Sequence, residues 1–286
     1  ACGRSNPQAL RVPKKELILR QKQTKRQLAL QLGISISSLY YQSKKLAKDW
    51  EWKNKIAGVL NRHPAYGYRR VALELKINKK KAQRIMRLFG LKAYRRRGRK
   101  YRKTRLKSNI YYPNLLKDIY PQRPRHLWAA DFTEIAWRKT KLFLATIIDL
   151  YTREIAGFAI MTNHATPLIM QALFAAINHC RQPMIFHSDN GREYISKTFV
   201  RALTSLNIKV SRSQPGCPWE NGYQEGFYSQ FKIDLGDPNR FKTLGELVYE
   251  IYRLIYDYNN KRIHLALKMP PRLFAQRHYQ LMQKHS

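Results

Sequence analysis

Residues 126–235 alternate short apolar runs with amphipathic stretches, and this alternation limits the possible folds more than any other feature of the chain. Three apolar runs of strand length come first, within residues 126–161. Their short connections predict an antiparallel meander. A helix over 166–178 follows, and then strand, helix, strand and helix. This order predicts an α/β fold, with a mixed five-stranded sheet that carries helices on both faces.

Three carboxylates lie at distinctive places in this segment. Asp131 is in the middle of the first run, HLWAADFTEIAW, and Asp189 follows the fourth, in MIFHSDNGREY. Glu225 lies 35 residues beyond Asp189, in a helix predicted from about residue 220 to 235. Lys232 is two turns after Glu225 on the same helix face. Each acid alone also fits a strand end, a turn or a solvated helix face.

Together, the three carboxylates suit a two-metal site. Two Mg²⁺ ions about 3.5–4 Å apart hold the attacking and the leaving oxygen of a phosphodiester, and Mg²⁺ prefers carboxylate oxygens. Such chemistry needs no protein nucleophile, and none is evident. Asn190 and Asn221, one and four positions from the acids, either orient the site or serve as turn and cap residues.

The chain is strongly basic. It has 55 Lys and Arg against 18 Asp and Glu, a formal charge of +37. Residues 1–125 hold 35 of the basic and 5 of the acidic side chains. This excess predicts a nucleic-acid partner, although RNA-binding proteins share it. No apolar run approaches membrane-spanning length. Three scattered cysteines form neither a disulfide framework nor a zinc site, so we expect a cytoplasmic protein.

Two helix-turn-helix regions are expected before the sheet, at residues 1–47 and 48–92, with a polar stretch at 44–49 separating them. In the second region Asn78 caps a helix that Gly90 closes. Its apolar stripe faces inward and its basic face is the candidate for the DNA major groove. A lysine-rich solvated face is the alternative. The DNA contacts expected on this helix are Lys79, Lys80, Gln83, Arg84 and Arg87.

A basic linker is expected over residues 93–125, because YRRRGRKYRKTRLK has too little apolar surface to fold alone. Its arginines would contact phosphates or lie along a minor groove. The catalytic core is expected at 126–240 and a C-terminal helical extension at 241–286. The linker residues expected to contact DNA are Arg95, Arg96, Arg97, Arg99 and Arg102.

These motifs resemble the DDE transposases of bacterial insertion sequences, a retroviral-integrase-like group, and in particular the catalytic protein of the type made from two reading frames. The resemblance rests on WAADFTEI, HSDNGREY and WENGYQEGFYSQFK with their spacing, and covers about four fifths of the chain. YNNKRIHLALKMPPRLF resembles the family's C-terminal tail, with Ile263 where proline is more usual. The N-terminal His/Cys zinc set of retroviral integrases is missing from this sequence.

The resemblance implies an RNase H-like core in which Asp131, Asp189 and Glu225 bind two Mg²⁺ ions, with Mn²⁺ as a substitute. Lys232 would then pair with a phosphate beside the scissile bond. It also implies recognition of element ends in double-stranded DNA, strand cleavage, joining to a target, and a homo-oligomer that pairs two ends at the bacterial nucleoid. The alternatives are a DNA-binding regulator derived from a transposase, a nuclease that never joins strands, and an RNA-binding protein.

Overall fold

The computed structural model describes residues 25–31, 33, 35–37, 45–95, 112–214 and 221–284. The chain divides into two compact units, residues 1–52 and 53–286. In the first unit, helix α2 (Lys25–Gln31) forms where the sequence predicts one. Gly33 follows it with a φ of +60°, a turn conformation that glycine adopts without strain. Most of the next expected helix lies outside the described residues.

Helix α4 (Lys45–Arg62) begins earlier than the sequence suggested. The prediction of a polar separator at 44–49 is wrong from residue 45 onward, because these residues form the first turns of α4. Leucine, alanine and lysine favour helix, and neither glycine nor proline interrupts them here. The polar composition of residues 44–49 therefore does not indicate a boundary between the two helical regions.

Two further helices, α5 (Tyr68–Glu74) and α6 (Lys79–Leu88), follow in the second unit. The Asn78 side chain accepts a hydrogen bond from the Lys80 amide at 2.8 Å, so the predicted cap of α6 is confirmed. The predicted apolar stripe of α6 is confirmed as well, because Ala82, Ile85 and Met86 are buried.

The sheet has five strands, in the spatial order β3-β2-β1-β4-β5. Strands β1, β2 and β3 form the predicted antiparallel meander, while β4 and β5 run parallel to β1. This mixed sheet with its helices is an RNase H-like fold, as predicted. The strands are β1 (Leu127–Trp137), β2 (Thr140–Asp149), β3 (Ile155–Met161), β4 (Ile185–Ser188) and β5 (Lys209–Arg212).

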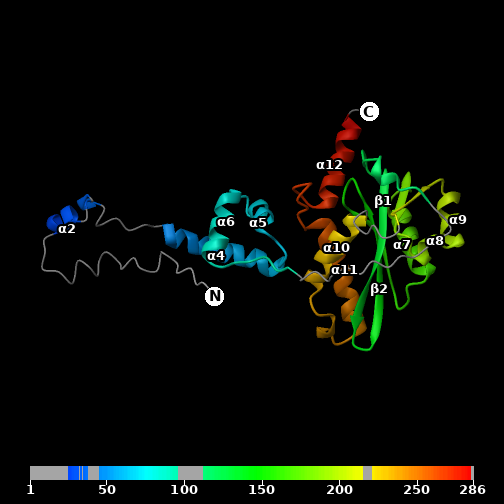
Figure 1. Cartoon of the computed structure of the whole chain (residues 1–286), viewed down its shortest axis with the longest axis horizontal. Coiled ribbons are helices and arrows are strands. Elements are labelled where there is room, and N and C mark those ends of the chain that lie inside the picture. The colour runs from blue at the N-terminus through cyan, green and yellow to red at the C-terminus, as the bar shows by residue number, and fades with distance from the viewer. Residues whose placement is uncertain are drawn as a thin grey trace. The chain divides into compact units, whose positions relative to one another are not determined.

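Helices cover both faces of the sheet, and each face has its own hydrophobic core (Figure 1). One core includes Trp128 and Phe186 of the sheet, and the other includes Leu144 and Ile185. On the first face lie α7 (Thr166–His179), α8 (Arg192–Ile195) and α9 (Lys197–Ser205). On the second face lie α10 (Gly222–Leu235) and α11 (Leu244–Asn260).

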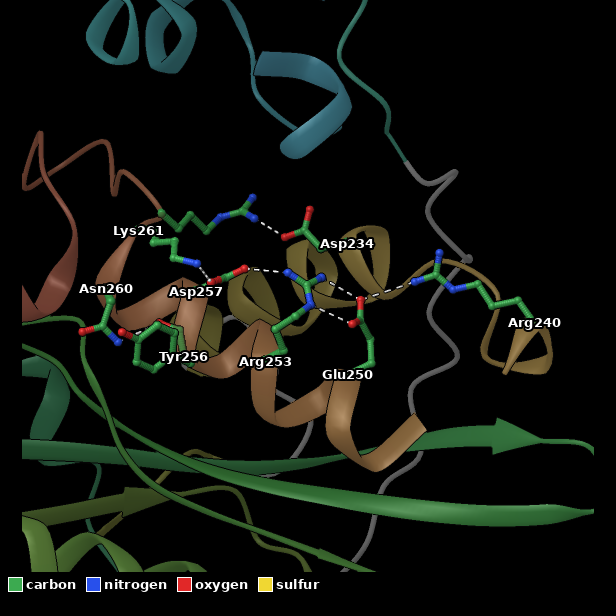
Figure 2. Close-up of polar contacts among 9 residues, drawn as sticks. Asp234, Arg240, Glu250, Arg253, Tyr256, Asp257, Asn260 and Lys261 are labelled. Atoms are coloured by element: carbon green, nitrogen blue, oxygen red, sulfur yellow. Dashed lines mark hydrogen bonds and ion pairs between the residues drawn. The ribbon is translucent and has the colours of Figure 1, made fainter. Parts of the chain in front are cut away.

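The outer face of α11 carries a series of ion pairs (Figure 2). Arg253 lies 2.7 Å from both Glu250 and Asp257, and Asp257 lies 2.7 Å from Lys261. Glu250 also pairs with Arg240 of the short helix η3 (Pro238–Arg240) at 3.4 Å. Single exposed pairs contribute only about 0.3–0.5 kcal/mol, but this series links the loop after α10 to the end of α11.

The remaining described elements are the short helix η1 (Leu115–Lys117) before the sheet and α12 (Pro271–Lys284) after α11. Helix α12 lies in the segment where the sequence predicted a helical extension. No helix in the described parts of the chain is both long and apolar enough to cross a bilayer.

Candidate active site

Strands β1 and β4 bring the first two predicted carboxylates to equivalent positions. The strands are parallel neighbours, and Ala129 pairs with His187. Asp131, in the middle of β1, and Asp189, directly after the end of β4, each lie two residues further along the chain, so continuing this register brings them to neighbouring positions. Asp131 is also paired with Thr146 of β2 in the antiparallel ladder.

The electrostatics of Asp131 show which charges surround it. Burial, together with the charges of Asp189 and Glu225, raises the pKa of the Asp131 carboxyl to about 8. The Phe132 amide, 2.8 Å from Asp131 Oδ1, and the Lys232 ammonium act in the opposite direction. The predicted acids and the predicted lysine therefore influence one another. Their surplus negative charge suits a bound cation.

Asp189 lies in the tight turn after β4. Burial raises the pKa of its carboxyl and Glu193 adds to this, while the Gly191 amide, 2.9 Å from Asp189 Oδ1, lowers the pKa. Asn190 donates to the Ser213 carbonyl oxygen at 2.5 Å, which ties this turn to the chain after β5. Asn190 thus orients the turn that carries Asp189.

A buried arginine supports the same turn. Arg212 is 1% exposed, and its positive charge lowers the pKa of Asp189. Its Nη2 donates to the Tyr194 carbonyl oxygen at 2.8 Å, and its guanidinium lies 4.4 Å from the centre of the Tyr112 ring. The sequence analysis missed Arg212. Its signal was a charged residue at the end of a short strand, β5.

Helix α10 carries the third carboxylate, Glu225, whose side chain is exposed. Residues 215–220, which lead into this helix, lie outside the described part of the chain. Within the described part, no three His, Cys, Asp or Glu side chains are grouped closely enough to hold a metal ion. The three-carboxylate metal site therefore stays a prediction, although its three members interact through their charges.

A buried polar network joins α10 to the strand of Asp131. The Gln224 amide nitrogen donates to the Ala129 carbonyl oxygen at 2.6 Å and the Thr146 carbonyl oxygen at 3.1 Å. The Tyr228 hydroxyl lies 2.7 Å from the Asp131 carbonyl oxygen. The Thr146 hydroxyl lies 2.9 Å from Gln224 Oε1 and 2.8 Å from the Tyr228 oxygen, so it can donate its hydrogen bond to either of them.

This network was missed by the sequence analysis. Its signal was two polar residues, Gln224 and Tyr228, four positions apart among the aromatic residues of α10. Because these residues lie on both sides of Glu225 in sequence, the network fixes the backbone that carries the third acid. Asn221 also contacts β1, donating to the Ala130 carbonyl oxygen at 3.3 Å. Its buried Oδ1 has no hydrogen-bond partner among the described residues.

The predicted DNA contacts on α6 are all exposed, as contact with a groove requires; they are Lys79, Lys80, Gln83, Arg84 and Arg87. Arg95, in the expected linker, is exposed too. The other four linker arginines, Arg96, Arg97, Arg99 and Arg102, lie outside the described residues.

Comparison with known proteins finds integrase core domains and insertion-sequence transposases. Two integrase core domain models match residues 121–218, which include Asp131 and Asp189, and residues 206–271, which include Glu225. The putative transposase InsK of insertion element IS150 from Escherichia coli K12 is 31% identical over 245 residues, covering 81% of this chain and 86% of InsK. The IS904 transposase of Lactococcus lactis is 30% identical, covering 74% and 88%.

Two of the solved structures that are similar in fold come from retroviruses. The HTLV-2 integrase catalytic core domain in complex with magnesium is 20% identical with a TM-score of 0.46, and the match covers 55% of this chain and 99% of that one. A simian T-cell lymphotropic virus intasome chain is 19% identical with a TM-score of 0.49, covering 72% and 70%.

Proposed function

The chain belongs to the transposases of bacterial insertion sequences that carry an integrase core domain, and we propose that Asp131, Asp189 and Glu225 are its catalytic carboxylates. As a DDE-type transposase it is a polynucleotidyl transferase that acts on DNA. The observation that supports the assignment is the register of β1 and β4, in which Ala129 pairs with His187 two residues before Asp131 and Asp189. The charge of Glu225 acting on Asp131 supports the third member.

An integrase-type core depends on divalent metal ions. We propose that each site of this protein binds two Mg²⁺ ions, and that Mn²⁺ can replace them. The three side chains suit Mg²⁺, because all of them supply oxygen ligands and a cation would offset the repulsion between their negative charges. When bound, the ions activate water or a 3′-hydroxyl for in-line attack and stabilise the leaving oxygen. The protein's part is to hold the three carboxylates in place; because burial raises the pKa of Asp131 and Asp189, a bound cation would be what favours their ionised forms.

Other residues near the acids position the substrate. Lys232 contacts a phosphate beside the scissile bond, because its charge already acts on Asp131. Asn221 orients the carboxylates or the substrate strand; its buried Oδ1, which has no hydrogen-bond partner among the described residues, can accept from a donor on the strand. No protein nucleophile takes part, since the attacking group is water or a DNA hydroxyl.

The DNA is bound mainly by the basic N-terminal half. The exposed cations of α6 read the ends of the element in the major groove, and the linker arginines hold phosphates. Pairing two ends and a target requires more than one copy of the chain, so we propose a homo-oligomer of two or more copies that works at the bacterial nucleoid. The domain boundaries expected from the sequence are part of this proposal, except the one at 47/48, which falls inside α4.

Cleavage and joining of labelled duplexes carrying the element's ends, in Mg²⁺ or Mn²⁺, test the proposal. The comparison is wild type, Asp189→Asn, and Asp118→Asn as a control at an exposed carboxylate remote in sequence from the motifs. We expect joined products from wild type and the control, and none from Asp189→Asn. Hydrolysis without joining would identify a nuclease, and binding without cleavage a regulator.

A further inference from the structure

The C-terminal segment after α11 is fixed against the helices that precede the core. The Tyr66 side chain is fully buried, and its hydroxyl accepts a hydrogen bond from the Ile263 amide at 2.8 Å. The Arg262 guanidinium lies 5.5 Å from the centre of the Tyr66 ring. Arg262 also donates to Gln230 at 2.9 Å and pairs with Asp234, both on α10. Residues 262–269 thus have a defined place beside α5 and α6.

A cleft of about 530 Å³ lies where this segment meets α5 and α6. Its cationic lining residues are Arg69, Lys79 and Lys268, which come from α5, α6 and the C-terminal segment. Ile77 and Leu265 contribute apolar surface, and none of the described residues that line the cleft is acidic. Three cations around a partly apolar cleft suit a ligand that is both anionic and carbon-rich.

Two of the cations are held in specific conformations. Arg69 Nε lies 3.3 Å from the Tyr68 hydroxyl, which limits the orientations of the guanidinium. Lys268 has a φ of +59°, a left-handed conformation that costs an L-residue such as lysine about 1–2 kcal/mol. Its amide donates to the His264 carbonyl oxygen at 2.7 Å, within a turn closed by the His264–Met269 bridge. Glycine would relieve this strain, so the Lys268 side chain can be removed by a substitution that the backbone tolerates.

We propose that this cleft binds the sugar–phosphate backbone of duplex DNA beside the groove that α6 enters. The cations contact phosphate oxygens, and the apolar surface packs against deoxyribose. The position agrees with the geometry of helix-turn-helix proteins, in which the helix before the recognition helix crosses the DNA backbone. The C-terminal segment therefore completes the DNA-binding surface of the helical region. The inference rests on the proposed function, because it assumes that α6 faces DNA.

The test is fluorescence anisotropy of the full chain with a labelled random-sequence duplex of about 25 base pairs, because phosphate contacts carry no sequence information. Lys268→Gly removes the charge and relieves the backbone strain. Lys76→Gly is the matched control, since Lys76 is an exposed lysine with a φ of +51° that does not line the cleft. Binding is measured between about 50 and 200 mM salt, and thermal unfolding is measured alongside.

We expect Lys268→Gly to weaken binding roughly three- to tenfold at low salt and to reduce the log–log salt slope by about 0.9, with no loss of thermal stability. Lys76→Gly should stay within about twofold of wild type. Wild-type binding by Lys268→Gly, or an equal loss in Lys76→Gly, would overturn the cleft assignment while DNA joining by wild type remains. Failure of the wild type to bind any duplex would instead overturn the proposed function.

Discussion

The hydroxyl of Tyr228 on α10 lies 2.7 Å from the backbone carbonyl oxygen of Asp131 on β1. This contact joins the helix of Glu225 directly to the residue that supplies the first carboxylate. Gln224 adds a second attachment through the Ala129 carbonyl oxygen at 2.6 Å. Moving α10 relative to β1 would leave these buried polar groups unsatisfied, and each such group costs about 1–3 kcal/mol. Closure around metal therefore needs rotation of the exposed Glu225 side chain more than movement of its helix.

Tyr228→Phe should lower the free energy of unfolding by about 1–2 kcal/mol, because the Asp131 and Leu144 carbonyl oxygens lose the hydroxyl that donates to them. It should also weaken Mn²⁺ binding several-fold, since α10 is then held less firmly. Denaturant unfolding and a Mn²⁺ titration measure the two effects. Tyr223→Phe, an exposed position on the same helix, should change neither. Unchanged metal binding in Tyr228→Phe would show that the network serves stability alone.

Asp131→Asn should stabilise the metal-free protein by about 1 kcal/mol or more, because it removes a buried carboxylate next to Asp189 and Glu225. At the same time it should abolish the rise in melting temperature that Mg²⁺ or Mn²⁺ gives the wild type. Thermal unfolding with and without metal tests both parts. A variant that is less stable than wild type, or that metal still stabilises, would contradict the assignment.

The junction between the helical region and the C-terminal segment should weaken in acid. Burial lowers the pKa of His63 and of His264 to about 4, and Arg262 contributes in both cases. Between about pH 6.5 and 4 the unfolded chain binds more protons than the folded one. The stability that these neutral imidazoles contribute is thus present above pH 6.5 and lost as the pH falls toward 4. His63→Phe should flatten the decline in urea-unfolding free energy between pH 7 and 5; an unchanged slope would contradict this origin.

Gly157→Ala should destabilise the core strongly. A Cβ at Gly157 on β3 would lie 2.4 Å from the Ala176 amide nitrogen and 2.6 Å from the Ala172 carbonyl oxygen, both in the backbone of α7. Relief requires separation of α7 from the sheet, and we expect a loss of about 2–4 kcal/mol in unfolding free energy. Gly58→Ala, in α4 with nothing within 4 Å, should instead stabilise by about 0.5–1 kcal/mol. Similar effects of the two substitutions would contradict the close packing of β3 on α7.

The sheet and its helices could be predicted because, along residues 126–260, the periodicity of the apolar residues and the positions of the glycines, prolines and capping residues indicate the same elements. Asp131 and Asp189 were identifiable because each interrupts or ends an apolar run. The start of α4 could not be identified from the sequence, because a polar helix and a polar linker have the same composition. The Gln224, Tyr228 and Thr146 network depends on contacts between a helix and strands far apart in sequence, which no local pattern encodes.

The C-terminal segment shows the same limit. Arg262 reads as a solvated basic residue, yet it is 6% exposed and lies against Asp234 and the Tyr66 ring. Its burial comes from three segments that meet only in the fold. The cleft lined by Lys268 could not be foreseen for the same reason, because its cations come from α5, α6 and the chain after α11.

The most direct test of the central claim is a Mn²⁺ binding measurement by electron paramagnetic resonance on the full chain with an element-end duplex, comparing wild type with Glu225→Gln. If Asp131, Asp189 and Glu225 form one site, wild type binds two Mn²⁺ ions per chain and the variant loses at least one of them, while both bind the duplex equally. Equal Mn²⁺ binding by the two proteins would contradict the three-carboxylate site.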